Sequence, residues 1–329
     1  MRKSLLSFIL LAITFAVSAQ DIHFSQYYAS PLTLNPALTG KFNGTYRFQA
    51  IYRNQWASVT VPYVTYSGSA DFGLFRNSLG NDVIGLGLMV YSDQSGDGHL
   101  TSQSVLLSLA YHKALDRDNR HQISLGFQGG MVQKRIDLGG LYFEDQWDGS
   151  GFGPPTSEIL DDNMMYPDFN AGFLWNSNFS ENFDLYAGFS YNHITEPNET
   201  FLGATNKLDS RYAFHAGMSI GIGDNLDLLP SVLYLSQTSA QEISTGAALG
   251  YQMTDETTLY FGGWYRFNDA FIPVAAIEFY GFRIGLSYDV NVSDLKAASR
   301  SMGAFEVSLI YQNIVESRHY NPVRYCPRF

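Results

Sequence analysis

The clearest structural signal in this chain is the stretch FRIGLSYD at residues 282–289. Every second side chain of the stretch is large and apolar: Phe282, Ile284, Leu286 and Tyr288. The side chains between them are charged or small: Arg283, Gly285, Ser287 and Asp289. Successive side chains of a β-strand point to opposite faces, so this alternation predicts a strand with one apolar face and one polar or small face.

The same alternation recurs along most of the chain, for example in the stretches 45–53, 183–192, 211–220 and 304–312. We count about fourteen such segments, each long enough for a tilted strand to cross a bilayer. They are 43–54, 62–75, 82–92, 101–113, 121–133, 166–177, 183–194, 210–221, 226–237, 240–251, 257–267, 270–280, 281–291 and 302–313. Pro230 interrupts the pattern of the ninth segment, and Pro273 leaves the start of the twelfth uncertain.

The connections between the segments fall into two classes. Those after even-numbered segments are short, whereas several after odd-numbered segments are long: 55–61, 93–100, 134–165, 195–209 and 292–301. Membrane barrels have short periplasmic turns and long outer loops, and a secreted soluble β-protein, the alternative reading, has no reason to sort its loops. We therefore predict an all-β, transmembrane antiparallel β-barrel of the outer membrane, with both ends of the chain on the periplasmic side.

The start of the chain has the layout of an export signal. Arg2 and Lys3 precede an uncharged apolar run that ends in small residues at 17–19. This layout predicts a secretory signal peptide over residues 1–19, with Gln20 as the new first residue.

We divide the rest of the chain into three parts. Residues 20–41 lack the barrel pattern, and we expect them to fold into the lumen or pack under the barrel as a plug. Residues 42–313 form the barrel, and 314–329 form a periplasmic tail. The tail holds the lone cysteine, Cys326, so an intramolecular disulfide is excluded. The net charge of −11 makes nucleic acid a poor partner.

Two long loops carry the candidate binding residues. The loop 134–165 has clustered carboxylates and aromatic side chains with no strong structural pattern, which is typical of functional loops. The candidates for partner binding on it and on the loop 195–209 are Glu144, Asp145, Trp147, Asp148, Phe152, Glu196 and Phe201. We expect no metal site and no cofactor, because no histidines pair at a metal-ligand spacing.

Charged residues on the predicted inner faces leave two readings open. Five arginines and several carboxylates either line a pore or pair across the lumen and hold it shut. An outer-membrane hydrolase is a third reading, because His193 and His215 lie on polar faces among many serines. There is no G-x-S-x-G motif, and we expect no enzymatic activity.

An ordered set of strings goes beyond the generic barrel. The strings are QDIHFSQ at 20–26, PLTLNPALTG at 31–40, YRNQW at 52–56, PTSE at 155–158, YNHITEPN at 191–198, WYRFNDA at 264–270, GLSYDVN at 285–291 and CPRF at 326–329. Together they resemble the PorP/SprF family of type IX secretion system outer-membrane proteins, over the whole chain after residue 19.

The resemblance implies a non-enzymatic barrel that assists the export or surface attachment of a large secreted protein, such as a gliding-motility adhesin. The implied partners are a client with a C-terminal sorting domain and other components of type IX secretion. Lipid and lipopolysaccharide of the outer membrane are expected around the barrel wall. An outer-membrane porin or substrate-specific channel is the alternative, since the same fold serves both functions.

Overall fold

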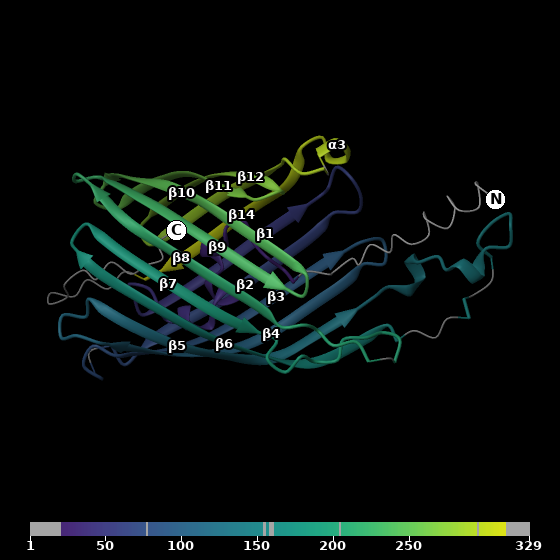
Figure 1. Ribbon diagram of the computed structural model, residues 1–329, viewed down its shortest axis with the longest axis horizontal. Coiled ribbons are helices and arrows are strands. Elements are labelled where there is room, and N and C mark those ends of the chain that lie inside the picture. Colours follow the sequence, from purple (N-terminus) through teal and green to yellow (C-terminus); the bar gives the residue numbers. More distant parts are fainter. Residues whose placement is uncertain are drawn as a thin grey trace, which may run out of the picture.

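The computed structural model describes residues 21–76, 78–153, 156–157, 161–203, 205–294 and 296–313. Within these ranges the chain forms one closed antiparallel β-barrel in which β1 pairs with both β2 and β14 (Figure 1). The predicted signal peptide, residues 1–19, and the predicted tail, residues 314–329, lie outside the described residues. No helix within the described ranges is long and apolar enough to cross a membrane.

Each of the fourteen predicted segments corresponds to one strand, and the predicted barrel is confirmed. The strands are β1 (Tyr46–Gln55), β2 (Tyr63–Leu74), β3 (Val83–Ser95), β4 (Leu100–Ala114), β5 (His121–Arg135), β6 (Asn163–Ser180), β7 (Phe183–Asn192), β8 (Arg211–Ile222), β9 (Leu226–Gln237), β10 (Ala240–Thr254), β11 (Thr257–Arg266), β12 (Ala270–Phe279), β13 (Phe282–Asn291) and β14 (Met302–Gln312). The largest difference is in β6, which starts three residues before the predicted 166 and ends three residues after 177.

The burial pattern is that of a barrel whose apolar face points outward. Leu107, Leu125 and Phe261 on the outer face are 63%, 61% and 60% exposed. Ser287 and Asp289 on the inner face are only 3% and 1% exposed. A soluble sandwich would bury the apolar side chains instead, so this arrangement matches a wall that faces lipid.

The two ends of the barrel differ. We call the end with the connections 56–62, 96–99, 136–162, 193–210, 238–239, 267–269 and 292–301 the loop end. The opposite end, with the connections 75–82, 115–120, 181–182, 223–225, 255–256 and 280–281, is the turn end. Six short helices are not part of the wall of strands. Three of them precede β1: η1 (Tyr27–Ala29), α2 (Pro31–Leu34) and η2 (Pro36–Leu38). The other three lie on connections of the loop end: η3 (Leu138–Gly140), η4 (Glu144–Gln146) and α3 (Lys296–Ser299).

Candidate functional site

The segment before β1 runs through the lumen from the loop end to the turn end. We call Asp21–Lys41 the inner segment; its purple coil is enclosed by the strands in Figure 1. At the loop end, the backbone N–H of Asp21 donates to Gln237 Oε1 at 3.1 Å. At the turn end, the backbone N–H of Gly40 donates to Asp71 Oδ2 at 2.7 Å. The structure therefore places this segment inside the barrel rather than beneath it. The prediction that both ends of the chain lie on the periplasmic side is wrong for Asp21, the first described residue, because the inner segment crosses the lumen from the loop end before β1 begins.

A buried ionic cluster binds the part of the inner segment that lies nearer the loop end. It consists of Arg53, Arg266, Asp289 and Glu306, so that two cations offset two anions. The backbone N–H of Ser25 donates to Glu306 at 2.7 Å, and the Ser25 hydroxyl donates to Asp289 at 2.7 Å. Because charge-assisted hydrogen bonds are the strong ones, this cluster joins the segment firmly to β1, β11, β13 and β14.

Aromatic side chains of the inner segment pack against one side of the wall. The buried apolar cluster includes Phe24, Tyr27, Tyr28, Leu34, Leu229, Leu233, Trp264 and Ile272. The rings of Tyr28 and Trp264 lie 5.4 Å apart. The inner face of β9 is therefore partly apolar, since it meets protein instead of water, and this explains the weak alternation of the ninth predicted segment.

Glycines of the wall allow the part of the inner segment nearest the turn end to approach the strands closely. A Cβ added at Gly126 of β5 would lie 2.2 Å from the carbonyl carbon of Pro36. A Cβ at Gly85 of β3 would lie 1.9 Å from the carbonyl oxygen of Thr39. Both contacts are with backbone, which cannot swing aside, so these positions accept no side chain while the segment is seated.

We expect Gly126→Ala to destabilise the folded barrel by about 1–3 kcal/mol, because the new methyl group overpacks against Pro36. The measurement is the temperature at which purified protein loses its folded migration on gels. Gly68→Ala is the matched control, because a Cβ at Gly68 would have its nearest neighbours at 3.8 Å. Equal midpoints for both variants would contradict the close seating of the segment.

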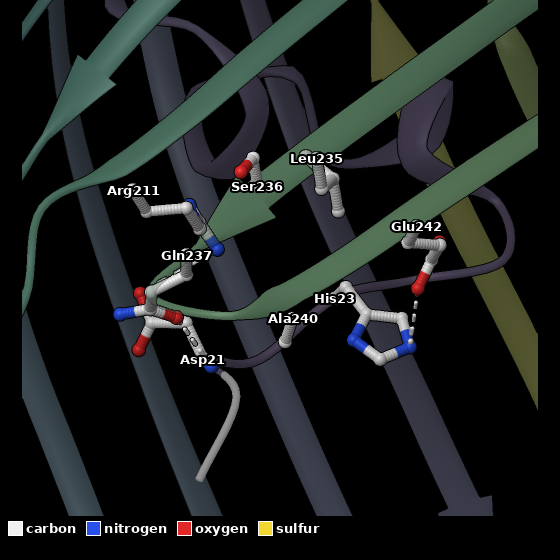
Figure 2. Close-up of a pocket in the computed structure, with 8 residues that line it drawn as sticks. All are labelled: Asp21, His23, Arg211, Leu235, Ser236, Gln237, Ala240 and Glu242. Carbon is white, nitrogen blue, oxygen red and sulfur yellow. Dashed lines mark hydrogen bonds and ion pairs between the residues drawn. The ribbon is translucent and has the colours of Figure 1, made fainter. Parts of the chain in front are cut away.

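At the loop end, the start of the inner segment is held by a histidine between two carboxylates. His193 Nε2 lies 2.6 Å from Asp21 and Nδ1 lies 2.9 Å from Asp168. Asp21 also forms an ion pair with Arg211, at 3.5 Å. Both residues line a pocket together with Gln237 (Figure 2). Burial alone would lower the pKa of His193, but the two carboxylates raise it to about 9.

This raised pKa predicts that alkaline conditions loosen the loop end. The pKa of His193 in the folded protein is higher than its ordinary value of 6.5. The ion pairs of protonated His193 therefore contribute their full stabilisation of the fold below pH 6.5. This stabilisation fades as the pH rises through about 9. The measurement is again the temperature at which the protein loses its folded migration on gels. We expect this temperature to decrease as the pH rises from about 7 to about 10, and His193→Gln to remove most of that decrease. The same pH profile in both proteins would refute the role of His193.

The cavities beside the start of the inner segment are small. Those lined by Asp21, His23, Phe24 and Arg211 provide about 20 Å³ each. Such a volume holds roughly one water molecule. The arginines and carboxylates predicted on the inner faces thus pair with each other and with the segment, for example Arg47 with Asp71 at 2.7 Å.

A second notable surface lies outside the barrel, on the connection between β5 and β6. The rings of Tyr142 and Trp147 flank Phe152, with centroids 4.7 and 5.1 Å from it. The carboxylates of Glu144, Asp145 and Asp148 lie on the same stretch of chain. We call Tyr142, Glu144, Asp145, Trp147, Asp148 and Phe152 the acidic aromatic surface.

The structure groups five of the seven predicted binding residues and separates the other two. The five lie in the acidic aromatic surface: Glu144, Asp145, Trp147, Asp148 and Phe152. Glu196 lies on the connection between β7 and β8, where it contacts Lys207 at 3.8 Å and accepts a hydrogen bond from Ser210. Phe201 lies on the same connection, and its carbonyl oxygen accepts a hydrogen bond from the Asp161 N–H of the first loop at 2.9 Å.

Sequence reasoning missed the residues by which the inner segment binds the wall. Ser25, Gln26 and Asn35 are buried and bonded to strands far along the chain. Among the described residues, no three histidine, cysteine or carboxylate side chains form a group that could hold a metal ion. The only local signal was the absence of alternation in a segment rich in small polar residues.

Solved structures with the same architecture are outer-membrane barrels. The CymD monoaromatic hydrocarbon channel is 11% identical with a TM-score of 0.54, and the match covers 88% of this chain and 94% of that chain. The Ralstonia pickettii toluene transporter TbuX is 10% identical with a TM-score of 0.52, covering 86% and 92%. The P. putida toluene transporter TodX is 10% identical with a TM-score of 0.50, covering 86% and 93%. At such low identity the likeness shows the fold alone.

Sequence comparison adds the family. No curated protein sequence matches the chain. The family model of the type IX secretion system membrane protein PorP/SprF matches residues 16–311, which includes every strand but the last residue of β14 and all of the inner segment. This match agrees with the resemblance carried by the ordered strings. The chain therefore belongs to the PorP/SprF family of type IX secretion system membrane proteins.

Proposed function

We propose that this protein is a non-enzymatic outer-membrane barrel that assists the export or surface attachment of a large secreted protein with a C-terminal sorting domain. The signal peptide at residues 1–19 would deliver the chain to the periplasm, and the loop end would face the outside of the cell. Gliding-motility adhesins are the kind of client that the family membership favours. Other components of type IX secretion are the expected partners in the membrane.

The position of the inner segment inside the lumen supports this proposal best. The inner segment lies in the barrel from Asp21 to Lys41, and the backbone N–H groups of Ser25 and Gly40 donate to the buried carboxylates of Glu306 and Asp71. An open diffusion channel needs a continuous water path, which a segment seated in this way obstructs. A barrel with its lumen closed acts through its surfaces, and the loop end offers the acidic aromatic surface.

The first test is a pulldown with the tagged full-length protein from solubilised outer membranes of its own cells. We expect mass spectrometry to identify one large secreted protein that carries a C-terminal sorting domain. Trp147→Ala/Phe152→Ala should lower its recovery by at least about tenfold, since exposed aromatic anchors dominate such interfaces. Val59→Ala, an exposed side chain on another connection of the loop end, is the matched control.

Two results would refute the proposal. One is the recovery of no such client by the wild-type protein. The other is a steady open-pore current from wild-type protein in planar bilayers, which would favour the porin reading instead.

A further inference from the structure

The acidic aromatic surface presents its rings to solvent. Tyr142 is 74% exposed, Trp147 is 53% exposed and Phe152 is 50% exposed. These side chains lie beyond the barrel wall, so lipid does not account for their exposure in the way it does for the outer faces of the strands. An exposed group of three contacting aromatic rings at a loop marks an interaction surface.

The rings are held by a small hairpin. Trp147 pairs with Phe152 as an isolated antiparallel bridge, and the Asp148 N–H donates to the Gly151 carbonyl oxygen at 3.1 Å. Asp145 accepts hydrogen bonds from the hydroxyl of Thr156 and the backbone N–H of Ser157. The surface is therefore built by its own backbone pairing and does not depend on a partner for its shape.

The charge of this connection has one sign. Between Ile136 and Asp162 the sequence has no lysine, arginine or histidine, and its acidic residues are Asp137, Glu144, Asp145, Asp148, Glu158, Asp161 and Asp162. Backbone and hydroxyl donors lower the pKa of both Asp145 and Asp148, so these carboxyls stay ionised. The aromatic rings thus lie in a strongly negative field with no internal counter-charge.

The negative charge of this surface selects among the partners that exposed aromatic rings alone could bind. A second copy of the same surface carries the same negative charge and would be repelled, and so would the phosphate groups of lipid and lipopolysaccharide. A lysine or arginine side chain fits both features, because its stem and charge stack on an aromatic face while carboxylates pair with the cation.

We infer that the acidic aromatic surface binds a lysine- and arginine-rich segment of a partner protein, with Trp147 and its neighbouring rings stacking on the cationic side chains. This inference rests on the proposed function, because it names the chemistry by which the client is held. Charge complementarity of this kind raises the association rate and makes binding sensitive to salt.

The experiment uses full-length protein in detergent and a fluorescent peptide of alternating lysine and serine, read out by anisotropy. We expect saturable binding that weakens as salt rises. Glu144→Gln/Asp148→Asn and, separately, Trp147→Ala should each weaken it at least about tenfold. The control Asp209→Asn/Asp294→Asn removes the same charge from other connections of the loop end and should bind as wild type does.

Several outcomes would overturn the inference. They are equal binding of a serine-only peptide, stronger binding of the neutral oligosaccharide maltoheptaose, and equal losses in the control and the Glu144→Gln/Asp148→Asn variant.

The client pulldown separates this inference from the proposed function. If Trp147→Ala/Phe152→Ala loses the client while Glu144→Gln/Asp148→Asn keeps it, the surface binds the client without using charge, and only the inference fails. If wild-type protein recovers no client at all, the proposed function fails, whatever the peptide shows.

Discussion

Deleting residues 22–41 is expected to open the barrel and raise its single-channel conductance in planar bilayers by more than about tenfold, because a fourteen-strand ring is wide enough for an aqueous lumen. The inner segment lies in the lumen of the wild-type barrel, and its Ala37 and Asn35 are completely buried. Keeping residues 1–21 preserves the predicted signal peptide and its cleavage region. The measurement is the size of current steps from equal amounts of purified protein.

The deletion also exposes buried charges, so folding must be checked separately. Folded protein should keep its heat-dependent migration on gels. Gln26→Ala/Asn35→Ala gives a second route to the same result, because it removes the bonds that these side chains make to Ser287, Ser308 and the Phe173 carbonyl oxygen while the segment stays in the chain and the buried charges stay balanced. A folded deletion variant with unchanged conductance would show that the segment does not close the barrel.

Replacing Arg53 should give the largest loss of stability. Arg53→Met leaves Asp289 and Glu306 buried with only Arg266 to offset them, and breaking a buried ion pair in this way costs about 3–5 kcal/mol. The measurement is the free energy of unfolding in urea, in detergent, followed by the folded and unfolded bands on gels.

A balanced double variant is the control for this prediction. Arg53→Met/Glu306→Gln leaves one cation, Arg266, and one anion, Asp289, so it should be more stable than Arg53→Met alone by about 1–2 kcal/mol. If the double variant were less stable by the sum of both single losses, charge balance would not be what stabilises the cluster.

The wall of the barrel could be predicted from the sequence because each strand carries its own evidence. Lipid on one side and polar contacts on the other impose an alternation that is visible within ten residues or so, without knowledge of any partner strand. In the stretch that starts at Phe282, the apolar side chains are the exposed ones and Asp289 is buried, as a barrel requires.

Two prolines show how the structure tolerates breaks in that pattern. Pro273 pairs with Gly263 of β11, but the pairing of β12 with β13 passes from Phe271 directly to Val274. Pro230 does the same in β9, where pairing with β8 is interrupted beside it. A proline lacks the N–H for one ladder bond, so the ladder lapses on one side only and the strand continues.

The interior could not be predicted in the same way. Ser25 and Glu306 are 281 positions apart in sequence, and no local sequence pattern predicts the hydrogen bond between them. The sequence showed only that residues 20–41 do not alternate and that inward charges exist. Whether those charges lined a pore or met a segment depended on where the segment lay.

The candidate site was predicted in part for a similar reason. Glu144 and Phe152 lie within one connection, so their proximity followed from sequence spacing alone. Glu196 and Phe201 belong to another connection, and their relation to the first loop depends on the hydrogen bond between Asp161 and the Phe201 carbonyl oxygen. Composition singled out these two loops as candidates but could not give the contacts between them.

The direction of the inner segment has a mechanical consequence. Its first described residue, Asp21, is at the loop end, and the chain reaches the turn end before it folds back into β1 at Tyr46. A force that pulls Asp21 away from the barrel would therefore be transmitted to the chain reversal between Lys41 and Tyr46, at the turn end. The tension would act along the inside of the wall, where many short bonds resist in shear together, rather than peeling any strand from its neighbour.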